Sequence, residues 1–435
     1  MTEGTPVTPS PMTPARRLRN IVGGSAGNLV EWFDWFAYAA FTVYFAPVFF
    51  PAGEPTAQLL STAAIFAVGF LMRPVGAWVM GVYADRKGRK AGLTLSVSLM
   101  CAGSLLIACT PGYATIGLLA PALLLLARMM QGLSVGGEYG SSATYLSEMA
   151  TAKHRGFWSS FQYVTLISGQ LLALMLLILL QRTLGEDALS DWAWRIPFFV
   201  GAALAVVVFW LRRGLDETRA FNDPATRAAP KSSALELILR HPKEALIVIG
   251  LTAGGTLAFY TYTTYLQKFL INTSGFTKAQ ATEISAAALF LFMLLQPAVG
   301  ALSDRVGRKP VMITFGILGV VCTVPIMSAL AVTTDAVTAF ALSLSALVIV
   351  SGYTAINAVV KAELFPAHIR ALGVALPYAL ANAVFGGTAE YVALWLKDRQ
   401  VESLYFWYVT GMIGVSLITY VLMRDTRTQS LIVED

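Results

Sequence analysis

The sequence predicts an all-α membrane protein, in which twelve transmembrane helices form two six-helix halves related by pseudo-twofold symmetry. Hydrophobic residues make up 56% of the 435 positions and charged residues 13%, about half the charged share of a soluble protein. Apolar runs of about 20 residues, the length with which a helix crosses about 30 Å of hydrocarbon, recur along the chain. A charged motif at 81–90 returns at 300–309, and its two aspartates lie 219 positions apart, which indicates two copies of one unit.

Each apolar run is long enough for a helical span, and a membrane interior leaves only helices or closed barrels. The runs cover approximately residues 21–45, 59–82, 91–110, 115–142, 157–181, 194–211, 244–268, 280–302, 310–331, 336–361, 370–396 and 403–423. We therefore divide the chain into a disordered cytoplasmic tail (1–19), a first six-helix bundle (20–211), a cytoplasmic linker (212–243), a second bundle (244–423) and a cytoplasmic tail (424–435).

Lysines and arginines lie mostly on one side of the predicted membrane. Of these 31 residues, 23 fall in segments assigned to the inner side and 6 in segments assigned to the outer side, which predicts that both termini are cytoplasmic. The net charge of +6 follows from this bias and indicates no nucleic-acid partner. The three cysteines fall within predicted spans, without the spacing of a disulfide framework or a metal site.

The first span carries two carboxylates on one helical face. Glu31 and Asp34 are three residues apart, and Asn28 and Tyr38 continue the same face. Carboxylates at this depth in a membrane are costly and usually functional. We interpret Asp34 and Glu31 as proton-coupling groups; the alternative is a structural ion pair or a cap beside a kink.

Two arginines also fall within apolar runs. Arg73 precedes Pro74, so it either binds an anion in a cavity or satisfies a carbonyl group that the proline frees. Arg128 lies roughly 18 Å deep in the fourth span and requires an anionic partner. Asp34 is the first candidate for that partner, as a transient or a permanent ion pair. Glu138, a further carboxylate in the same span, is a candidate proton-coupling group after Asp34.

Polar residues in three other spans are suited to lining a cavity. Gln162 lies on a polar flank of span five, and span ten carries Asn357 and Lys361. Span seven contains a dense hydroxyl run at 260–264, beginning with Tyr260. Hydrogen bonding between helices and an aromatic belt at the outer interface are the alternative interpretations.

The repeated charged motif predicts a gate at the cytoplasmic surface. Its two copies share their internal spacing, and a glutamate and an arginine seven residues apart follow each copy. We expect the carboxylates to meet helix N-termini and the charges to pair when this side is closed. The predicted gate residues are Asp85, Arg86, Arg89, Glu148 and Arg155 in the first half, and Asp304, Arg308, Glu363 and Arg370 in the second.

The motif and its neighbours resemble a known family. Two halves, each with G-x-x-x-D-R-x-G-R-K between its second and third helices, are similar to the major facilitator superfamily. Within it, the chain resembles the metabolite–proton symporters of bacteria from about residue 19 to 423. That resemblance rests on the stretches 28–34, 70–74, 128–132, 136–138 and 194–197. It implies a central cavity lined by helices 1, 4, 7 and 10, halves that rock around it, and a location in the bacterial inner membrane.

The resemblance implies import of a small carboxylate by proton symport, with α-ketoglutarate as the first expectation. Shikimate, citrate, proline and betaine are alternative substrates, because members of the resembled family carry them with similar helix arrangements. In this scheme Arg128 binds one carboxylate and Arg73 or Lys361 the other, while Tyr260 and Gln162 orient the keto end. Substrate displaces Asp34 from Arg128, so that Asp34 takes up a proton. We expect a monomer in the lipid bilayer without a cofactor or metal.

Three rival functions are less consistent with the sequence. A drug–proton antiporter typically carries a glycine–proline motif in helix five, where this chain has no proline at 167–171. A nutrient sensor of this fold tends to carry a large extra cytoplasmic domain, and the linker and tails are short. An enzyme would need a nucleophile with a base, a phosphate-binding loop or a metal cluster, and the sequence carries no such pattern.

Overall fold

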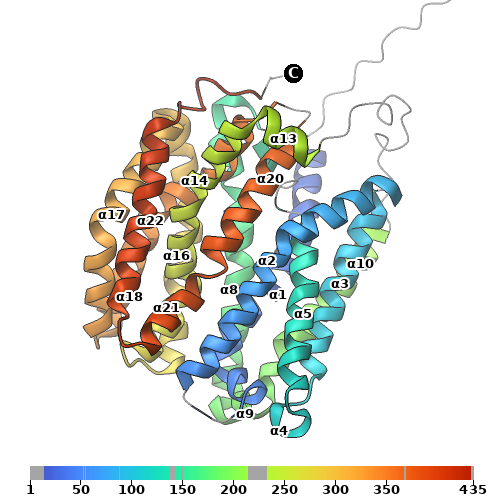
Figure 1. The fold of residues 1–435 in the computed structure, drawn as a ribbon, viewed down its shortest axis with the longest axis vertical. Helices are drawn as coiled ribbons and strands as arrows, with labels where there is room; N and C mark the ends of the chain where they lie inside the picture. The colour runs from blue at the N-terminus through green and yellow to red at the C-terminus, as the bar shows by residue number, and fades with distance from the viewer. Residues whose placement is uncertain are drawn as a thin grey trace, which may run out of the picture.

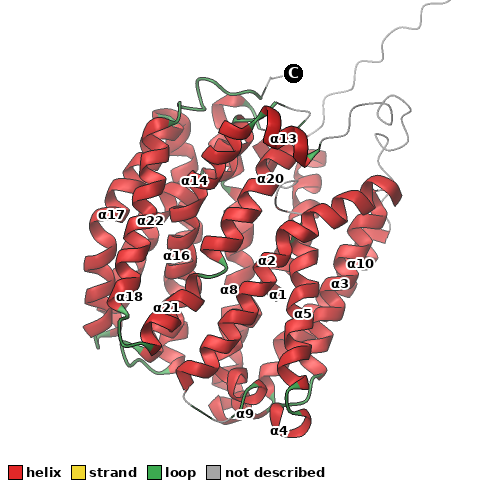
Figure 2. Cartoon of the chain, viewed as in Figure 1, coloured by secondary structure: helices red, strands yellow, loops and turns green. Residues whose placement is uncertain are grey.

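A computed structural model describes residues 14–51, 53, 55–87, 89–136, 139, 143–144, 146–147, 150–213, 233–366 and 369–432 of the chain. Within these ranges, the side chains of residues 14–27, 81–82, 84–93, 152 and 211–213 are outside the description. The described residues form helices joined by short loops, with no strand among them (Figure 2).

The first half of the chain contributes long helices, such as α1 and α2, together with short helical turns that connect them (Figure 1). They are α1 (Pro14–Phe49), α2 (Pro55–Lys87), α3 (Arg89–Cys109), α4 (Tyr113–Ile116), α5 (Leu119–Val135), the turn η1 (Ala152–His154), α7 (Arg155–Ser159), α8 (Phe161–Thr183), α9 (Gly185–Asp191), η2 (Ala193–Arg195) and α10 (Ile196–Arg213). Among these, α2 packs on α5, α1 on α8, and α3 on α10.

The short helix α13 (Ala234–Arg240) lies in the predicted linker and precedes the second half. The second half contains α14 (Pro242–Tyr260), η3 (Thr261–Tyr265), α15 (Leu266–Asn272), α16 (Lys278–Val306), α17 (Arg308–Val332), α18 (Ala336–Thr354), α19 (Asn357–Glu363), α20 (Arg370–Ala381), η4 (Asn382–Gly386), α21 (Ala389–Asp398) and α22 (Ser403–Leu422). The halves meet where α8 packs on α16 and where α2 packs on α20 and α21.

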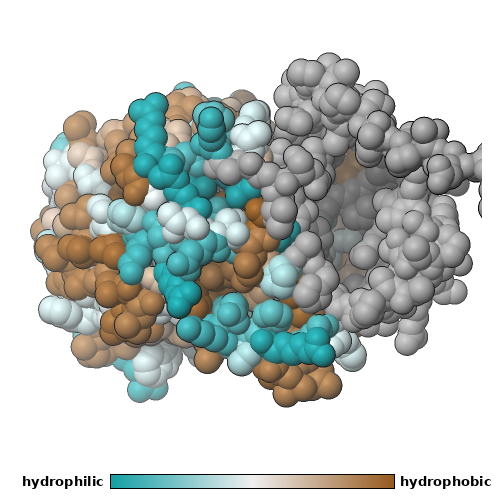
Figure 3. Space-filling view, turned by 90° about the horizontal axis from the view of Figure 1, so that it is seen from above, coloured by the Kyte–Doolittle hydropathy of each residue, from teal (hydrophilic) through white to brown (hydrophobic). Residues whose placement is uncertain are grey.

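Segments of the predicted length and hydropathy occur throughout the fold. Nine helical segments of the described residues are long and apolar enough to cross a membrane, and two shorter apolar helices, Thr94–Cys109 and Leu119–Val135, accompany them. With α1, these segments match the twelve predicted spans. Large apolar side chains stay exposed on the flanks, such as Trp78 (69%) and Trp407 (62%). Hydrophilic residues gather at the end where residues 424–432 lie, which we name the tail end (Figure 3); this pattern fits a belt of lipid around the flanks.

Small residues bring α2 and α5 close together. A Cβ atom at Gly132 would meet the backbone carbonyl group of Gly69, and one at Gly136 would meet the carbonyl group of Arg73. The two glycines are one helical turn apart, the spacing of a close-packed transmembrane helix pair. This approach positions Arg73 of α2 beside Arg128 of α5.

Replacing Gly132 with alanine is therefore expected to destabilise the fold by about 1–3 kcal/mol, the typical cost of overpacking. The measurement is the melting temperature of the purified protein in detergent. Gly411→Ala is the matched control, because no atom lies within 4 Å of a Cβ built there. Equal melting temperatures for the two variants would contradict this account of the α2–α5 contact.

Three helices of the second half are interrupted at sites that carry polar residues. π-Helical turns form at η3, directly after Tyr260, and at η4, which begins with Asn382. Residues 355–356 separate α18 from α19, which begins with Asn357. Such turns release backbone groups from the regular ladder and often occur at functional sites.

Two hydroxyl groups of the run in span seven, which was expected to face substrate or water, bind the backbone of their own helix. The hydroxyl groups of Thr261 and Thr263 donate to the carbonyl oxygens of Leu257 and Phe259 at 2.8 and 2.7 Å. Threonine in a helix can satisfy its hydroxyl group on the preceding turn, and the sequence pattern does not reveal this. Tyr260 is the member of the run that lies beside the candidate site.

Candidate functional site

A polar network inside the first half connects three helices. Asp34 of α1 and Arg128 of α5 are both fully buried. Arg128 Nη1 donates to Gln131 Oε1 at 2.6 Å, and Gln131 Nε2 donates to Asp34 Oδ2 at 2.6 Å. Ser104 Oγ of α3 donates to the same Asp34 oxygen at 2.5 Å. The network therefore joins a buried acid to a buried cation through a neutral amide.

The predicted direct contact between Asp34 and Arg128 is wrong in this structure. No ion pair within 4.0 Å joins these two described side chains, and Gln131 lies between them. An amide can fill this position because it offers one acceptor and one donor to its two charged neighbours. The two groups nevertheless share one network, as the sequence interpretation required.

Trp35 contacts two positive charges. The guanidinium carbon of Arg73 lies 4.1 Å from the centre of the Trp35 ring, and that of Arg128 lies 4.0 Å from the same ring. One indole ring therefore contacts both guanidinium groups. Each cation–π contact contributes about 0.5–2 kcal/mol. Phe70 and Tyr38 add a second ring to Arg73 and Arg128, at 4.0 and 4.4 Å.

Both arginines keep N–H groups without a hydrogen-bond partner. In each of them, Nε and Nη2 are buried and make no hydrogen bond within the described part of the chain. Arg73 Nε and Nη2 therefore do not donate to a carbonyl oxygen freed by Pro74, which was the alternative role considered from the sequence. Unsatisfied donors on a buried cation are costly, so an anionic ligand would be strongly favoured here.

Arg73 lines a small cavity between the two halves, which has room for about one water molecule. The other lining residues come from α1, from α5 and the residues that follow it, and from α20 with η4. The set is Trp32, Arg73, Val135, Gly136, Tyr139, Ala375, Tyr378, Ala379 and Asn382. Asn382 is fully buried, and neither of its side-chain amide atoms makes a hydrogen bond with a described residue. The cavity thus places a cation opposite an amide of the second half.

A third buried cation lies next to the cavity. Lys361 of α19 is fully buried, its Nζ donates to Tyr139 Oη at 3.1 Å, and it lies 3.8 Å from the ring centre of Tyr378. The Tyr139 hydroxyl group donates in turn to Asn357 Oδ1 at 3.1 Å. Tyr139 and Tyr378 stack with ring centres 3.8 Å apart. The predicted residues Lys361 and Asn357 are therefore brought to the cavity wall by two tyrosines.

The other predicted cavity residues differ in how closely they approach Arg73. The Tyr260 hydroxyl group lies beside the Arg73 guanidinium and the Asn382 amide. Glu31 is buried, near enough to Arg73 for their charges to interact. Gln162 is fully buried on α8, and the cavity lining does not include it. The side chain of Glu138 lies outside the described residues.

At the tail end, the second copy of the charged motif contacts the first half. Asp304 accepts hydrogen bonds from the backbone N–H groups of Gly156 and Phe157 at 2.8 and 2.9 Å. These N–H groups open α7, so the carboxylate meets a helix N-terminus, where negative charge is stabilised. Arg308 Nη1 also donates to Asp304 Oδ1 at 2.8 Å. Asp304 of the second motif copy thus meets the start of α7, a helix of the first half.

Glu363 joins arginines from both halves. Its Oε1 lies 3.8 Å from Arg155 Nη1 and 3.5 Å from Arg308 Nη2. Arg155 was expected to pair with the first motif copy, whereas here it contacts the glutamate of the second half. Arg370 Nε donates to the carbonyl oxygens of Ala362 and Phe365. The side chains of four other predicted gate residues, Asp85, Arg86, Arg89 and Glu148, lie outside the described residues.

Several site residues were not predicted from sequence. Tyr139, Tyr378 and Trp35 looked like ordinary apolar positions, because a pattern of hydropathy does not tell a cavity wall from a core. Lys268 was assigned to the outer surface, yet it is fully buried and its Nζ lies 2.8 Å from Glu390 Oε2. The position of Lys268 near the end of a predicted span suggested that it is exposed. Glu390 of α21 supplies the carboxylate that makes burial of Lys268 possible.

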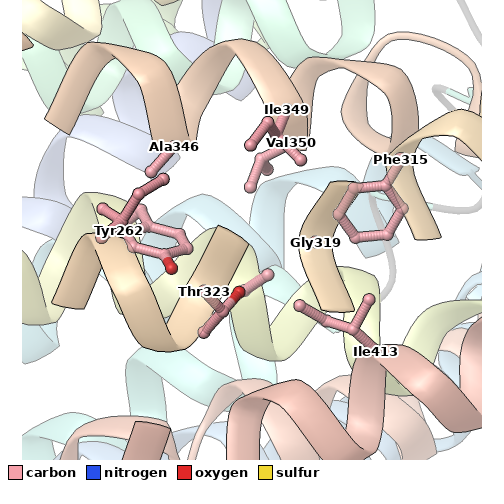
Figure 4. Close-up of a pocket in the computed structure, with 10 residues that line it drawn as sticks. Tyr262, Phe315, Gly319, Thr323, Ala346, Ile349, Val350 and Ile413 are labelled. Carbon is pink, nitrogen blue, oxygen red and sulfur yellow. The ribbon is translucent and has the colours of Figure 1, made fainter. Parts of the chain in front are cut away.

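A second small cavity lies inside the second half, between η3, α17, α18 and α22 (Figure 4). Its lining is apolar apart from Tyr262 and Thr323, whose hydroxyl ends point toward one another in Figure 4. It also has room for about one water molecule. Because no charged side chain lines it, it is a poorer candidate than the cavity at Arg73.

The amino-acid sequence matches the family described as "Sugar (and other) transporter" over residues 20–222 and 215–433. The chain belongs to this family. It is 54% identical over 427 residues to alpha-ketoglutarate permease of Escherichia coli (strain K12), over 98% of both chains. It is 37% identical over 375 residues to the citrate-proton symporter of Salmonella typhi, over 85% of each chain. The chain is therefore a multi-pass membrane transporter, as the sequence predicted.

Solved structures confirm the twelve-helix fold of the major facilitator superfamily. A crystal structure of a D-xylose-proton symporter aligns with a TM-score of 0.75 over 95% of this chain and 100% of that chain, at 19% identity. The xylose transporter of E. coli in a partially occluded inward open conformation aligns with a TM-score of 0.71 over 92% and 95% of the two chains, at 18% identity.

Proposed function

We propose that this transporter imports a small dicarboxylate, α-ketoglutarate first, together with protons, through a central site that opens alternately to the two sides. The observation that carries the proposal is the pair of buried arginines with unpartnered N–H groups, Arg73 and Arg128. A planar guanidinium can bond both oxygens of a carboxylate. Two such groups, both in contact with Trp35, could take the two ends of a dicarboxylate.

The 54% identity to alpha-ketoglutarate permease of E. coli supports this choice of substrate. In our proposal, Arg128 holds one carboxylate and Arg73 the other, with Lys361 near the second. Tyr260 and Asn382 offer a hydroxyl group and an amide beside Arg73, suited to the keto oxygen. Gln162, assigned to this role from sequence, is a positioning residue in the scheme because it lies outside the cavity lining.

Proton coupling is proposed to act through Asp34 and Gln131. Asp34 Oδ2 accepts both hydrogen bonds of the carboxylate, whereas Oδ1 makes none and faces Gly201. A proton on Oδ1 would therefore leave the network intact. Ionised Asp34 would repel a substrate carboxylate at Arg128, so protonation and substrate binding favour one another. This linkage replaces the direct competition for Arg128 inferred from sequence.

The proposed orientation has both termini and the tail end in the cytoplasm of a bacterial cell, with the chain in the inner membrane as a monomer. The excess of lysine and arginine in the segments assigned to that side supports it. We also retain the division into two bundles, 20–211 and 244–423, joined by a linker. Glu31 and Glu138 remain the next candidates for the proton-binding group after Asp34.

Counterflow in proteoliposomes tests the proposal. Vesicles loaded with unlabelled α-ketoglutarate are expected to take up labelled α-ketoglutarate, whereas vesicles loaded with citrate, shikimate, proline or betaine should take up at least about tenfold less, because binding energies that differ by about 1.4 kcal/mol produce that ratio. Empty liposomes and protein-free controls define the background. Counterflow with proline or betaine but not with dicarboxylates would refute the assignment of the arginine pair to two carboxylates.

A further inference from the structure

The residues that follow α22 are ordered against the gate at the tail end. Asp425 Oδ1 accepts a hydrogen bond from the backbone N–H group of Arg308 at 3.2 Å. Arg427 Nη1 donates to the carbonyl oxygen of Arg305 at 2.7 Å. These contacts attach residues 425–427 to the turn between α16 and α17, which carries the second copy of the charged motif.

Glu363 is the main attachment point further along the tail. Thr426 Oγ1 donates to Glu363 Oε2 at 2.6 Å, and the backbone N–H group of Leu431 donates to the Glu363 carbonyl oxygen at 3.1 Å. Thr426 is only 4% exposed. Arg370 Nη2 then donates to the Leu431 carbonyl oxygen at 2.9 Å. The tail thus binds both the side chain and the backbone of the gate glutamate.

The same segment reaches the first half of the molecule. Arg155 Nη1 donates to Ser430 Oγ at 3.3 Å. Ile432 is 8% exposed and belongs to a buried apolar cluster that includes Tyr139 and Ala143 of the first half and Phe365 of the second. A single extended segment therefore contacts residues that must separate if the tail end opens.

We propose that residues 424–432 form a strap that holds the tail end closed, by joining Arg155 of the first half to Glu363 and Arg370 of the second and by completing an apolar cluster that both halves share. Most of its hydrogen bonds go to the second half, to which it is also covalently attached through α22. When the halves part, the strap stays with the second half, the Arg155–Ser430 hydrogen bond breaks, and the apolar cluster around Ile432 loses its first-half members Tyr139 and Ala143. This inference rests on the proposed alternation between two openings, and it does not depend on the substrate.

The Thr426 hydroxyl group is the best point at which to loosen the strap. It gives the gate carboxylate Glu363 a third partner beside Arg155 and Arg308. Thr426→Val removes the hydrogen bond and keeps the shape, whereas Thr426→Ser keeps the hydroxyl group. Thr428 provides a matched control, because it is exposed and its hydroxyl group donates only within the tail, to the Asp425 carbonyl oxygen.

Labelling of a buried cysteine measures the opening. In a background without Cys101, Cys109 and Cys322, Ala143→Cys places a thiol at a fully buried position of the cluster, and a maleimide is added to the purified full chain in nanodiscs. Thr426→Val is expected to raise the labelling rate about tenfold, the ratio that a free-energy change of about 1.4 kcal/mol produces. Thr426→Ser and Thr428→Val are expected to keep the parent rate.

Equal labelling rates for Thr426→Val and its parent would refute the strap. A rise in the labelling rate of Thr428→Val as large as that of Thr426→Val would also refute it. If Thr426→Val fails to give a monodisperse protein, Ile432→Ser decides by the same criterion, since it weakens the apolar contact at the other end of the strap. The assay requires no transport. A parent that labels as expected but fails in counterflow would refute the proposed substrate and leave the strap intact.

Discussion

An Arg128→Lys variant is expected to lose about 100-fold or more in kcat/KM for uptake of α-ketoglutarate, with normal amounts of protein in the membrane. The guanidinium uses Nη1 to bind Gln131 and one face to stack on Trp35, and it keeps Nε and Nη2 open. A lysine ammonium is a point charge that cannot do all three. Truncating a partner of a buried charged hydrogen bond costs about 2–5 kcal/mol, and about 2.7 kcal/mol corresponds to 100-fold.

The matched control for this variant is Arg195→Lys. Arg195 also stacks on an indole ring, that of Trp194 at 4.0 Å, and donates to the Thr110 carbonyl oxygen at 2.9 Å, but it lies away from the cavity. Uptake should fall less than about threefold in this control, since a partly exposed hydrogen bond contributes only about 0.5 kcal/mol. Similar losses in the two variants would mean that Arg128 has a general packing role, and full activity of Arg128→Lys would remove it from the substrate site.

An Asp34→Asn variant is expected to exchange labelled substrate across the membrane but to lose accumulation driven by a proton gradient. The asparagine oxygen can accept the hydrogen bonds from Ser104 and Gln131 that Asp34 Oδ2 accepts. The site therefore keeps its geometry while the proton-binding oxygen is gone. With an imposed gradient of one pH unit, which is worth about 1.4 kcal/mol per proton, the parent concentrates substrate and the variant only equilibrates it.

The pH dependence supplies a second reading of the same experiment. Uptake by the parent should fall as the external pH rises, because a smaller fraction of Asp34 is protonated. Exchange by Asp34→Asn should not change with the external pH. Asp335→Asn is the control: Asp335 is an exposed helix cap that accepts a hydrogen bond from the Thr338 backbone at 2.7 Å. Undiminished accumulation by Asp34→Asn would move the coupling role to Glu31 or Glu138.

The strap also changes the interpretation of the gate. The sequence analysis identified Glu363, Arg308 and Arg155 through repeated spacing, and the structure brings these three together. It did not anticipate that the C-terminal tail would bind the same glutamate, because residues 424–432 lie outside the predicted spans and carry no apolar periodicity.

The amino-acid sequence alone was sufficient to determine the number of spans, the two copies and the buried charges. Each of these depends on a local property: the cost of placing a residue in hydrocarbon is paid at that residue, and a duplicated segment keeps its own spacing. Asp34, Arg73 and Arg128 were recognisable because charges in an apolar run need a reason to be there.

Only the tertiary structure decided which groups those charges meet. Gln131 lies between Asp34 and Arg128, Trp35 contacts both arginines, and Lys361 reaches Tyr139, which is 222 positions away in the chain. These pairings depend on how closely helices approach, which glycines such as Gly132 permit, and on which rotamers fit between them. A linear pattern records that a buried charge must be satisfied, but its partner is selected in three dimensions, by packing between helices that are far apart in sequence.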